Sequence, residues 1–219
     1  MNNKDWTGNG NSVWKTLGAS NHTDKEREAL EFYATDPRAL DLFVPRFPLR
    51  HKVFEPSCGQ GHLSKWLVEH GHDVLSTDLV DRGYGVGGID FFSVGNGSLF
   101  QSEGTKLLRG WAKGLTFDIL TNPPFAVALK YILHALELIP EDGRVIMFLK
   151  TTFLEGKERK EKLYDVNPPR YVFQYSSRIL CAKGGQFEYM KRHGSSAVSY
   201  AMYIWYKQNE EHKTEIKWL

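Results

Sequence analysis

Short apolar runs alternate with amphipathic, helix-like segments along much of the chain. The first strand candidates lie at 51–56, 72–79, 87–92, 117–122 and 143–150. An apolar stripe at helical spacing follows the first of these runs, at 61–71, and another follows the fourth, at 125–140. Strands that alternate with helices in this way are typical of a parallel sheet that is covered by helices. The pattern therefore predicts an α/β fold.

Two further apolar runs, at 170–177 and 196–207, predict strands with no strong helix pattern between them. The polar segment that joins them can form an antiparallel return at one edge of the sheet. At the other end of the chain, residues 1–23 are rich in Asn, Gly and Ser and are expected to be a lead-in or a lid. A charged helix is expected at 24–33. Residues 24–219 are expected to form a single domain.

A glycine-rich turn follows the first strand candidate. Gly59 and Gly61 lack a Cβ atom, so the backbone there can adopt positive φ and pass close to a ligand. Glu55 stands just before the turn, where a carboxylate repels a pyrophosphate and suits a ligand that carries an ammonium group. Asp78 ends the second strand candidate and can accept hydrogen bonds from a ribose diol. The turn therefore favours S-adenosylmethionine over NAD, although a tight turn without a ligand is the plainer alternative.

The fourth strand candidate runs into the sequence TNPPF, at 121–125. Both prolines lack an N–H group and restrict the backbone, so Asn122 and Pro123 can hold their carbonyl oxygens rigidly. Two such acceptors can bind both N–H groups of an exocyclic amine and expose the lone pair of its nitrogen. Phe125 offers a flat face on which a flipped-out base can stack.

These two motifs resemble those of class I S-adenosylmethionine-dependent methyltransferases. FEPSCGQG is similar to the first motif of that family, and TNPPF to the Asp/Asn-Pro-Pro-Tyr/Phe motif of its amino-methylating branch. The cofactor motif precedes the catalytic motif, as in the gamma group of adenine-N6 DNA methyltransferases. The wider spread of short motifs resembles small phage-borne or mobile-element-borne members of that group. The resemblance implies a Rossmann-like, seven-stranded, mostly parallel sheet with an antiparallel last strand and helices on both faces.

The resemblance also implies roles for individual residues. The expected catalytic residues are Asn122, Pro123, Pro124 and Phe125. The residues expected to bind S-adenosylmethionine are Tyr33, Thr35, Pro37, Glu55, Pro56, Ser57, Gly59, Gly61, Asp78, Leu79, Asp90, Phe91 and Asn122. In this assignment Glu55 lies near the methionine moiety, Asp78 at the ribose and Asp90 at the adenine amine. Residues 31–37 resemble the N-terminal motif that closes over the methionine carboxylate.

Other features of the sequence favour structural roles. A second Asn-Pro-Pro, at 167–169, carries Arg170 in place of the ring and is expected to stop a helix. Cys58 is expected to be a small buried residue, and the eight histidines show no spacing that predicts a metal site. The segment 176–196 mixes basic and aromatic residues, so it is either a nucleic-acid contact or a loop or edge hairpin.

Composition limits the class of protein. The chain has 219 residues, 41% hydrophobic and 25% charged, which is ordinary for one globular α/β domain. A net charge of +2 is too small to indicate polyanion binding by itself. Two cysteines cannot form a disulfide framework, and no signal peptide or apolar run long enough to cross a bilayer is evident. We therefore expect a cytoplasmic protein that does not enter the membrane.

The expected function is methyl transfer from S-adenosylmethionine to the N6 amine of adenine in DNA. Larger gamma-type enzymes carry a separate target-recognition domain, so sequence specificity here is expected to be low or to come from a partner or a homo-oligomer. An amide nitrogen needs the same two acceptors, so glutamine amides of proteins are an alternative substrate, as are RNA bases. A catalytically idle module that binds S-adenosylmethionine is the alternative from another class.

Overall fold

The computed structural model of the chain describes residues 32–95, 101–193 and 198–219. The strands are β1 (Tyr33–Thr35), β2 (Lys52–Glu55), β3 (Asp73–Ser76), β4 (Asp118–Thr121), β5 (Arg144–Lys150), β6 (Tyr171–Gln174), β7 (Cys181–Lys183), β8 (Tyr200–Tyr206) and β9 (Glu215–Trp218). The helices are α2 (Arg38–Phe43), α3 (His62–Glu69), α4 (Glu103–Ala112), α5 (Ala128–Leu138), α6 (Lys157–Arg159) and α7 (Phe187–His193). The 3-10 turns are η1 (Phe91–Ser93), η2 (Phe125–Val127) and η3 (Thr151–Leu154), and η4 (Lys160–Tyr164) is a π-helical turn.

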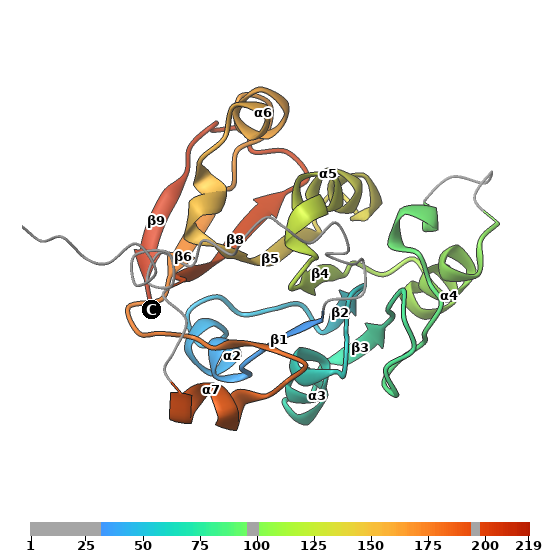
Figure 1. Cartoon of the computed structure of the whole chain (residues 1–219). Coiled ribbons are helices and arrows are strands. Elements are labelled where there is room, and N and C mark those ends of the chain that lie inside the picture. Colours follow the sequence, from blue (N-terminus) through green and yellow to red (C-terminus); the bar gives the residue numbers. More distant parts are fainter. Residues whose placement is uncertain (1–31, 96–100, 194–197) are drawn as a thin grey trace, which may run out of the picture.

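Seven strands form one sheet in the order β3-β2-β4-β5-β8-β6-β9 (Figure 1). The pairs β2–β3, β2–β4 and β4–β5 are parallel, so the carboxyl ends of these four strands meet at one edge of the sheet. β8 runs antiparallel to its neighbours β5 and β6, and β9 is parallel to β6. This sheet confirms the predicted Rossmann-like α/β class, with 196–207 supplying the antiparallel strand β8.

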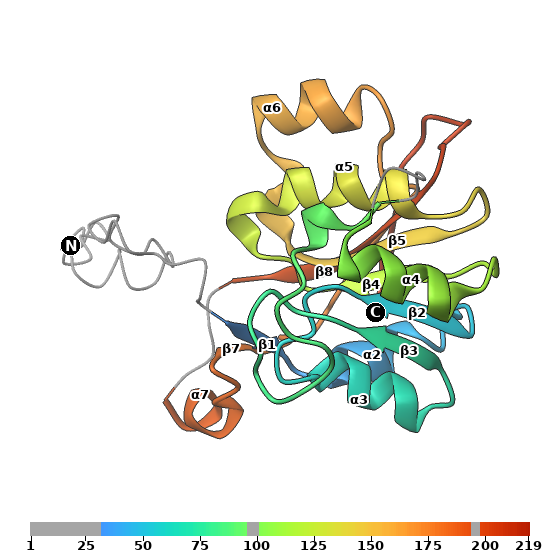
Figure 2. The ribbon, with the colours of Figure 1, turned by 90° about the vertical axis from the view of Figure 1, so that its right-hand side faces the viewer.

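Helices cover both faces of the sheet, and the alternating side chains of its strands supply a core to each face. α4, α5 and α6 lie on one face, and α2 and α3 lie on the other (Figure 2). In β5, Val145 and Met147 pack with α4 and α5, whereas Ile146 and Phe148 pack with α2 and α3. A strand that is buried on both faces reads as a continuous apolar run, which is how 143–150 appears in the sequence.

The predicted strand at 87–92 is wrong. Thr77 makes an isolated parallel bridge to Val86, and the chain then turns at Gly88, whose φ is +76°. Asp90 caps η1 by accepting the N–H of Phe92 at 3.0 Å. A run of glycines favours such turns over a strand because glycine loses much conformational freedom when it is extended. The seventh strand is instead β9, whose four residues are all exposed.

One other expectation needs correction, and the structure adds detail to a second. Tyr33, the expected end of a charged helix, lies in β1, and residues 24–31 of that helix lie outside the described residues, as does the lead-in at 1–23. The segment 176–196 joins β6 to β8, which pair antiparallel in the main sheet, as expected of an antiparallel return. Its strand β7 pairs antiparallel with β1 in a separate two-stranded sheet, and α7 follows. The single-domain assignment for 24–219 stays a prediction.

Candidate active site

The glycine-rich turn joins the carboxyl end of β2 to the start of α3. Gly59 and Gly61 have φ of +56° and +76°, a region that favours glycine. A Cβ atom on Gly59 would lie 1.9 Å from the ring of Phe32, and one on Gly61 would lie 2.3 Å from the ring of Tyr84. The structure therefore requires glycine at both positions, because two aromatic rings lie directly against the turn.

Asp78 fixes the turn through both of its carboxylate oxygens. Oδ2 accepts the N–H of Gly59 at 2.8 Å, and Oδ1 accepts the N–H of Val80 at 2.9 Å. The residue is 9% exposed. Each carboxylate oxygen can accept a second hydrogen bond, so this arrangement leaves capacity for a ligand hydroxyl. Leu79, the next residue, is largely exposed.

Glu55 is buried at the carboxyl end of β2, with 2% of its surface exposed. The hydroxyl of Ser64, on the first turns of α3, donates to its carboxyl group. Burial raises the pKa of Glu55 to about 8, although the hydrogen bond from Ser64 opposes the shift. The carboxyl group is therefore largely protonated at neutral pH, and a cation bound beside it would favour its ionised form.

Tyr131 ties α5 to the same turn. Its hydroxyl donates to the carbonyl oxygen of Pro56 at 3.0 Å and also forms a hydrogen bond with the hydroxyl of Ser57. Its ring stacks on Phe91 with a centroid separation of 4.2 Å. Tyr131 was missed at the sequence level because it lies on the apolar stripe of the helix. The sequence signal that could have identified it is the phenol group, because a buried tyrosine hydroxyl needs a hydrogen-bond partner.

Asn122 directly follows β4, which is the neighbour of β2 in the sheet. The nitrogen of its side-chain amide makes two contacts. Nδ2 donates to the carbonyl oxygen of Tyr33 at 3.1 Å and contacts the Sγ atom of Cys181 at 3.5 Å. The oxygen of the same amide, Oδ1, is buried and makes no hydrogen bond with any described residue. A buried acceptor without a donor is costly, and this oxygen is free to accept a hydrogen bond from a ligand.

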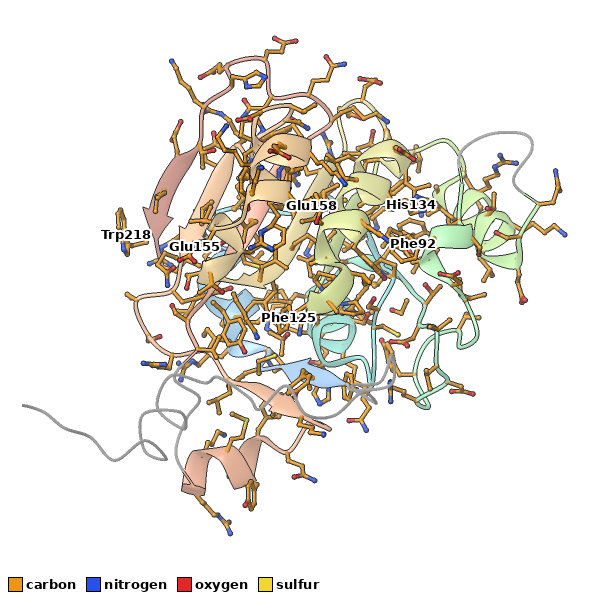
Figure 3. The ribbon with its side chains drawn as sticks, turned by 45° about the horizontal axis from the view of Figure 1, so that its top comes forward. Phe92, Phe125, His134, Glu155, Glu158 and Trp218 are labelled. Atoms are coloured by element: carbon orange, nitrogen blue, oxygen red, sulfur yellow. The ribbon has the colours of Figure 1, made fainter. Side chains whose placement is uncertain are left out.

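Phe125 begins η2 directly after the two prolines (Figure 3). Pro123 is buried and Pro124 is exposed, and the carbonyl oxygen of Pro124 accepts the N–H of Val127 at 3.1 Å. The ring of Phe125 is half-buried and stacks with Tyr200, with centroids 6.2 Å apart and an interplanar angle of 27°. The structure thus places an aromatic ring within the same short turn as the orphaned acceptor of Asn122.

The N-terminal motif packs against this turn. β1 pairs with β7 so that Tyr33 is opposite Lys183 and Thr35 is opposite Cys181. Thr35 is 2% exposed, and its buried hydroxyl makes no hydrogen bond with any described residue. Pro37 directly precedes α2. The structure therefore brings Tyr33 into contact with Asn122 and places Thr35 opposite Cys181, which also contacts Asn122.

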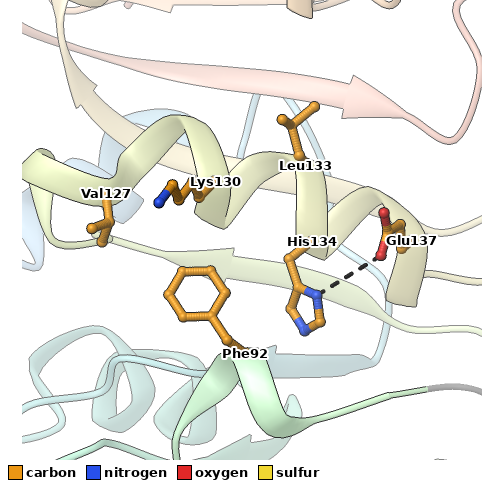
Figure 4. Close-up of a pocket in the computed structure, with 6 residues that line it drawn as sticks. All are labelled: Phe92, Val127, Lys130, Leu133, His134 and Glu137. Atoms are coloured by element: carbon orange, nitrogen blue, oxygen red, sulfur yellow. Dashed lines mark ion pairs between the residues drawn. The ribbon is translucent and has the colours of Figure 1, made fainter. Parts of the chain in front are cut away.

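A surface hollow of about 440 Å³ lies between α5 and η1, on the side where Asp90 was expected to read an adenine (Figure 4). It is lined by Phe92, Val127, Lys130, Leu133, His134 and Glu137. His134 lies across it and forms a 3.0 Å hydrogen bond with the carbonyl oxygen of Phe91. Asp90 itself is exposed, and Phe91 is buried against Tyr131, so neither residue lines the hollow.

The second Asn-Pro-Pro and Cys58 both make contacts within the fold. Asn167 donates from Nδ2 to the carbonyl oxygens of Tyr206 and Lys207, at 3.1 and 3.2 Å, and thereby joins the end of η4 to the end of β8. Cys58 is buried and free. Within residues 32–95, 101–193 and 198–219, no group of three His, Cys, Asp or Glu side chains is arranged to hold a metal ion. In those same ranges no helix has the length and apolar character needed to cross a membrane.

No family model matches the chain, and no curated protein matches it by sequence. Solved structures with a similar fold do exist. A type I restriction-modification methyltransferase subunit from Streptococcus thermophilus aligns with a TM-score of 0.56 at 13% identity, over 86% of this chain and 47% of that one. This chain thus spans about half of that subunit's length.

Two other structures align at similar levels. A proposed hemolysin from Lactococcus lactis has a TM-score of 0.52 at 10% identity, over 83% of this chain and 90% of that one. A proposed RNA methyltransferase from Pyrococcus horikoshii has a TM-score of 0.50 at 14% identity, over 78% of this chain and 82% of that one. At such identities a likeness shows the fold alone. This chain has the Rossmann-like fold that these structures share.

Proposed function

We propose that the protein is an S-adenosylmethionine-dependent N-methyltransferase that acts on the N6 amine of adenine in DNA. The observation that carries this proposal is the side chain of Asn122. Its Nδ2 donates to the carbonyl oxygen of Tyr33, and its Oδ1 is buried with no donor among the residues that the structure describes. An acceptor fixed in this way is suited to bind an N–H group of an amine.

The residues around the glycine turn fit the cofactor. Its ammonium group would lie near the buried Glu55, its ribose near Asp78, and its carboxylate within reach of the orphaned hydroxyl of Thr35. When bound, S-adenosylmethionine supplies an electrophilic methyl group on a sulfonium centre. The likeness in fold to methyltransferase structures supports this choice of cofactor.

The chain's own residues would prepare the amine. An exocyclic amine on an aromatic ring is a weak nucleophile, because its lone pair is delocalised into the ring. Asn122 Oδ1 and the carbonyl oxygen of Pro123 would accept the two N–H groups, which favours a more tetrahedral nitrogen with an exposed lone pair. Phe125 would hold the base by stacking, and positioning then lowers the barrier further. The methylated ammonium product is strongly acidic, so the site needs no strong general base.

The DNA assignment draws on the Asn-Pro-Pro-Phe motif and on the likeness to a type I restriction-modification methyltransferase subunit. RNA bases are the second candidate substrate, because the fold also resembles a proposed RNA methyltransferase. Sequence recognition is proposed to come from a partner or a second copy of the chain. An idle binding module would bind the cofactor and transfer no methyl group.

The test is incubation with isotope-labelled S-adenosylmethionine and separate pools of DNA, RNA and protein, followed by mass analysis of the modified unit. N6-methyladenine in DNA supports the proposal. Label in RNA or in glutamine moves the assignment to that substrate, and cofactor binding with no transfer to any pool overturns it. Asn122→Ala, run in parallel, controls for a contaminating host methyltransferase.

A further inference from the structure

Lys150 ends β5 and lies beside the proposed catalytic motif. In the sheet β5 is the parallel neighbour of β4, which leads into Asn122. The ammonium group of Lys150 lies 4.8 Å from the centroid of the Phe125 ring. On the antiparallel side Lys150 is the direct cross-strand partner of Tyr200, whose ring stacks with Phe125. Cross-strand partners point to the same face of a sheet, so these three side chains form one cluster.

The charge of Lys150 is not neutralised by a carboxylate among the described residues. The next three lysines along the chain differ from it, because each has a carboxylate partner. Lys157 pairs with Glu161 at 3.8 Å, Lys160 with Asp165 at 2.7 Å and Lys162 with Glu158 at 2.8 Å. Lys150 is also half-buried rather than fully solvated. An ammonium group in such a position interacts favourably with an aromatic ring, but far less strongly than with an anion.

The positive charge of Lys150 also acts on Cys181, which contacts Asn122. Burial raises the pKa of the Cys181 thiol to about 11, and the positive charge of Lys150 opposes that rise. Cys181 in turn lies 3.5 Å from Nδ2 of Asn122. Lys150 therefore places a positive charge beside Phe125 and near the thiol that contacts Asn122.

A base that stacks on Phe125 would take the place of the ammonium group over the ring. A substrate with an anionic group beside the base can hold the displaced ammonium, whereas a neutral amide side chain of a protein cannot. We propose that Lys150 is a specificity-determining residue that binds a backbone phosphate next to the target adenine. This inference rests on the proposed function, and it names the feature of DNA that the site would recognise besides the base.

The closing experiment uses the full chain and the DNA fragment that the labelling experiment identifies. One version of the fragment carries its natural phosphates, and another carries uncharged methylphosphonates at the two linkages that flank the modified adenine. Binding is followed by fluorescence anisotropy at several salt concentrations, and methyl transfer is followed by steady-state kinetics. The variants are Lys150→Met, which keeps the aliphatic stem, Lys150→Arg, which keeps the charge, and Lys113→Met. Lys113 is exposed just before β4, at the opposite edge of the sheet, and serves as the control.

For Lys150→Met we expect KM for natural DNA to rise about tenfold while kcat is unchanged, because the contact positions the substrate and takes no part in the chemistry. The slope of log affinity against log salt should fall in magnitude by about 0.7 to 0.9, which corresponds to one phosphate contact. On the methylphosphonate fragment the variant and the wild type should behave alike. Lys150→Arg should restore binding to natural DNA, and Lys113→Met should change neither quantity.

Equal losses on the charged and uncharged fragments would mean that Lys150 has a structural role only, and an unchanged salt slope would exclude the phosphate contact. In both cases the wild type still methylates DNA and the proposed function stands. If the wild type methylates no DNA, the proposed function fails and this inference fails with it.

Discussion

The side chain of Asn122 donates from Nδ2 to the main-chain carbonyl oxygen of Tyr33 at 3.1 Å. Tyr33 comes from the N-terminal strand β1, and Asn122 follows the central strand β4. The bond determines which end of the amide faces the site, because the nitrogen is already engaged and only the oxygen is left to accept. A residue distant in sequence thereby orients the proposed catalytic group.

Asn122→Ala should lower kcat about a hundredfold or more, because it removes an acceptor that acts on the reacting amine. The melting temperature should fall only slightly, because one hydrogen bond to Tyr33 is lost, and any loss of cofactor affinity should be far smaller than the loss of kcat. Steady-state methyl transfer, thermal unfolding and cofactor titration measure the three quantities.

The second Asn-Pro-Pro provides the contrasting variant. Asn167→Ala removes hydrogen bonds to Tyr206 and Lys207, so it should lower the melting temperature while activity per folded molecule is kept. If Asn167→Ala lost catalysis with its stability intact, or if Asn122→Ala kept near-normal kcat, the roles assigned to the two copies would be wrong.

Asp78→Ala should weaken S-adenosylmethionine binding by tenfold or more. The carboxylate accepts N–H groups from Gly59 and Val80, so its loss would free the glycine turn as well as remove the proposed ribose acceptor. Isothermal titration calorimetry of the variant measures this change. An unchanged dissociation constant would contradict the assignment of Asp78 to the cofactor site.

Gly59→Ala should destabilise the protein by about 1 to 3 kcal/mol, because φ at this position is +56° and the added methyl group would meet the ring of Phe32. Gly110→Ala is the matched control. Gly110 lies within α4, where a Cβ atom would meet nothing within 4 Å, so the change should stabilise by roughly 0.4 to 1 kcal/mol. Urea unfolding of both variants measures the change in the free energy of unfolding, which should be opposite in sign for the two. A stabilising effect of Gly59→Ala would show that the ring of Phe32 is not held against the turn.

Glu55 should make stability depend on pH. Its pKa is raised from 4.5 to about 8 in the folded chain, so the folded state keeps a proton that the unfolded state loses. The contribution of this group to stability is fully present below about pH 4.5 and is lost as the pH rises toward 8. The slope is at most about 1.4 kcal/mol per pH unit.

Glu55→Gln should remove that dependence, so the variant should gain stability relative to the wild type between pH 5 and pH 8. Urea unfolding at several pH values tests this. If the free energy of unfolding depended on pH in the same way for the variant and the wild type, the prediction would be contradicted. The ammonium group of the cofactor should favour the ionised carboxylate, so binding near neutral pH should release up to one proton. Calorimetry in two buffers of different ionisation enthalpy would detect that release.

The sequence was sufficient for the parts of the fold and site that depend on local signals. The alternation of β2, α3, β4 and α5, the glycine turn and the proline-stopped strand before Phe125 could all be predicted, because each has a period or a residue type that fixes its backbone. The strand expected at 87–92 was wrong, because its apolar residues are preceded by glycines that turn the chain.

Tertiary contacts carry little signal in a single sequence. All four residues of β9 are exposed, so it lacks the continuous apolar run of a buried strand. Phe32, Tyr84 and Tyr131 looked like ordinary aromatic residues, and only the folded chain shows that they lie against the glycine turn. The contact between Lys150 and Phe125 likewise could not be predicted from the sequence, because it depends on how β5 and β8 pair in the sheet.

The central claim is methyl transfer to the N6 amine of adenine in DNA, and mass analysis of nucleosides from DNA treated with labelled S-adenosylmethionine tests it most directly. We predict labelled N6-methyladenine with the wild type and about a hundredfold less with Asn122→Ala. Label that appears in RNA or protein and not in DNA, or an equal yield from both enzymes, would contradict the claim.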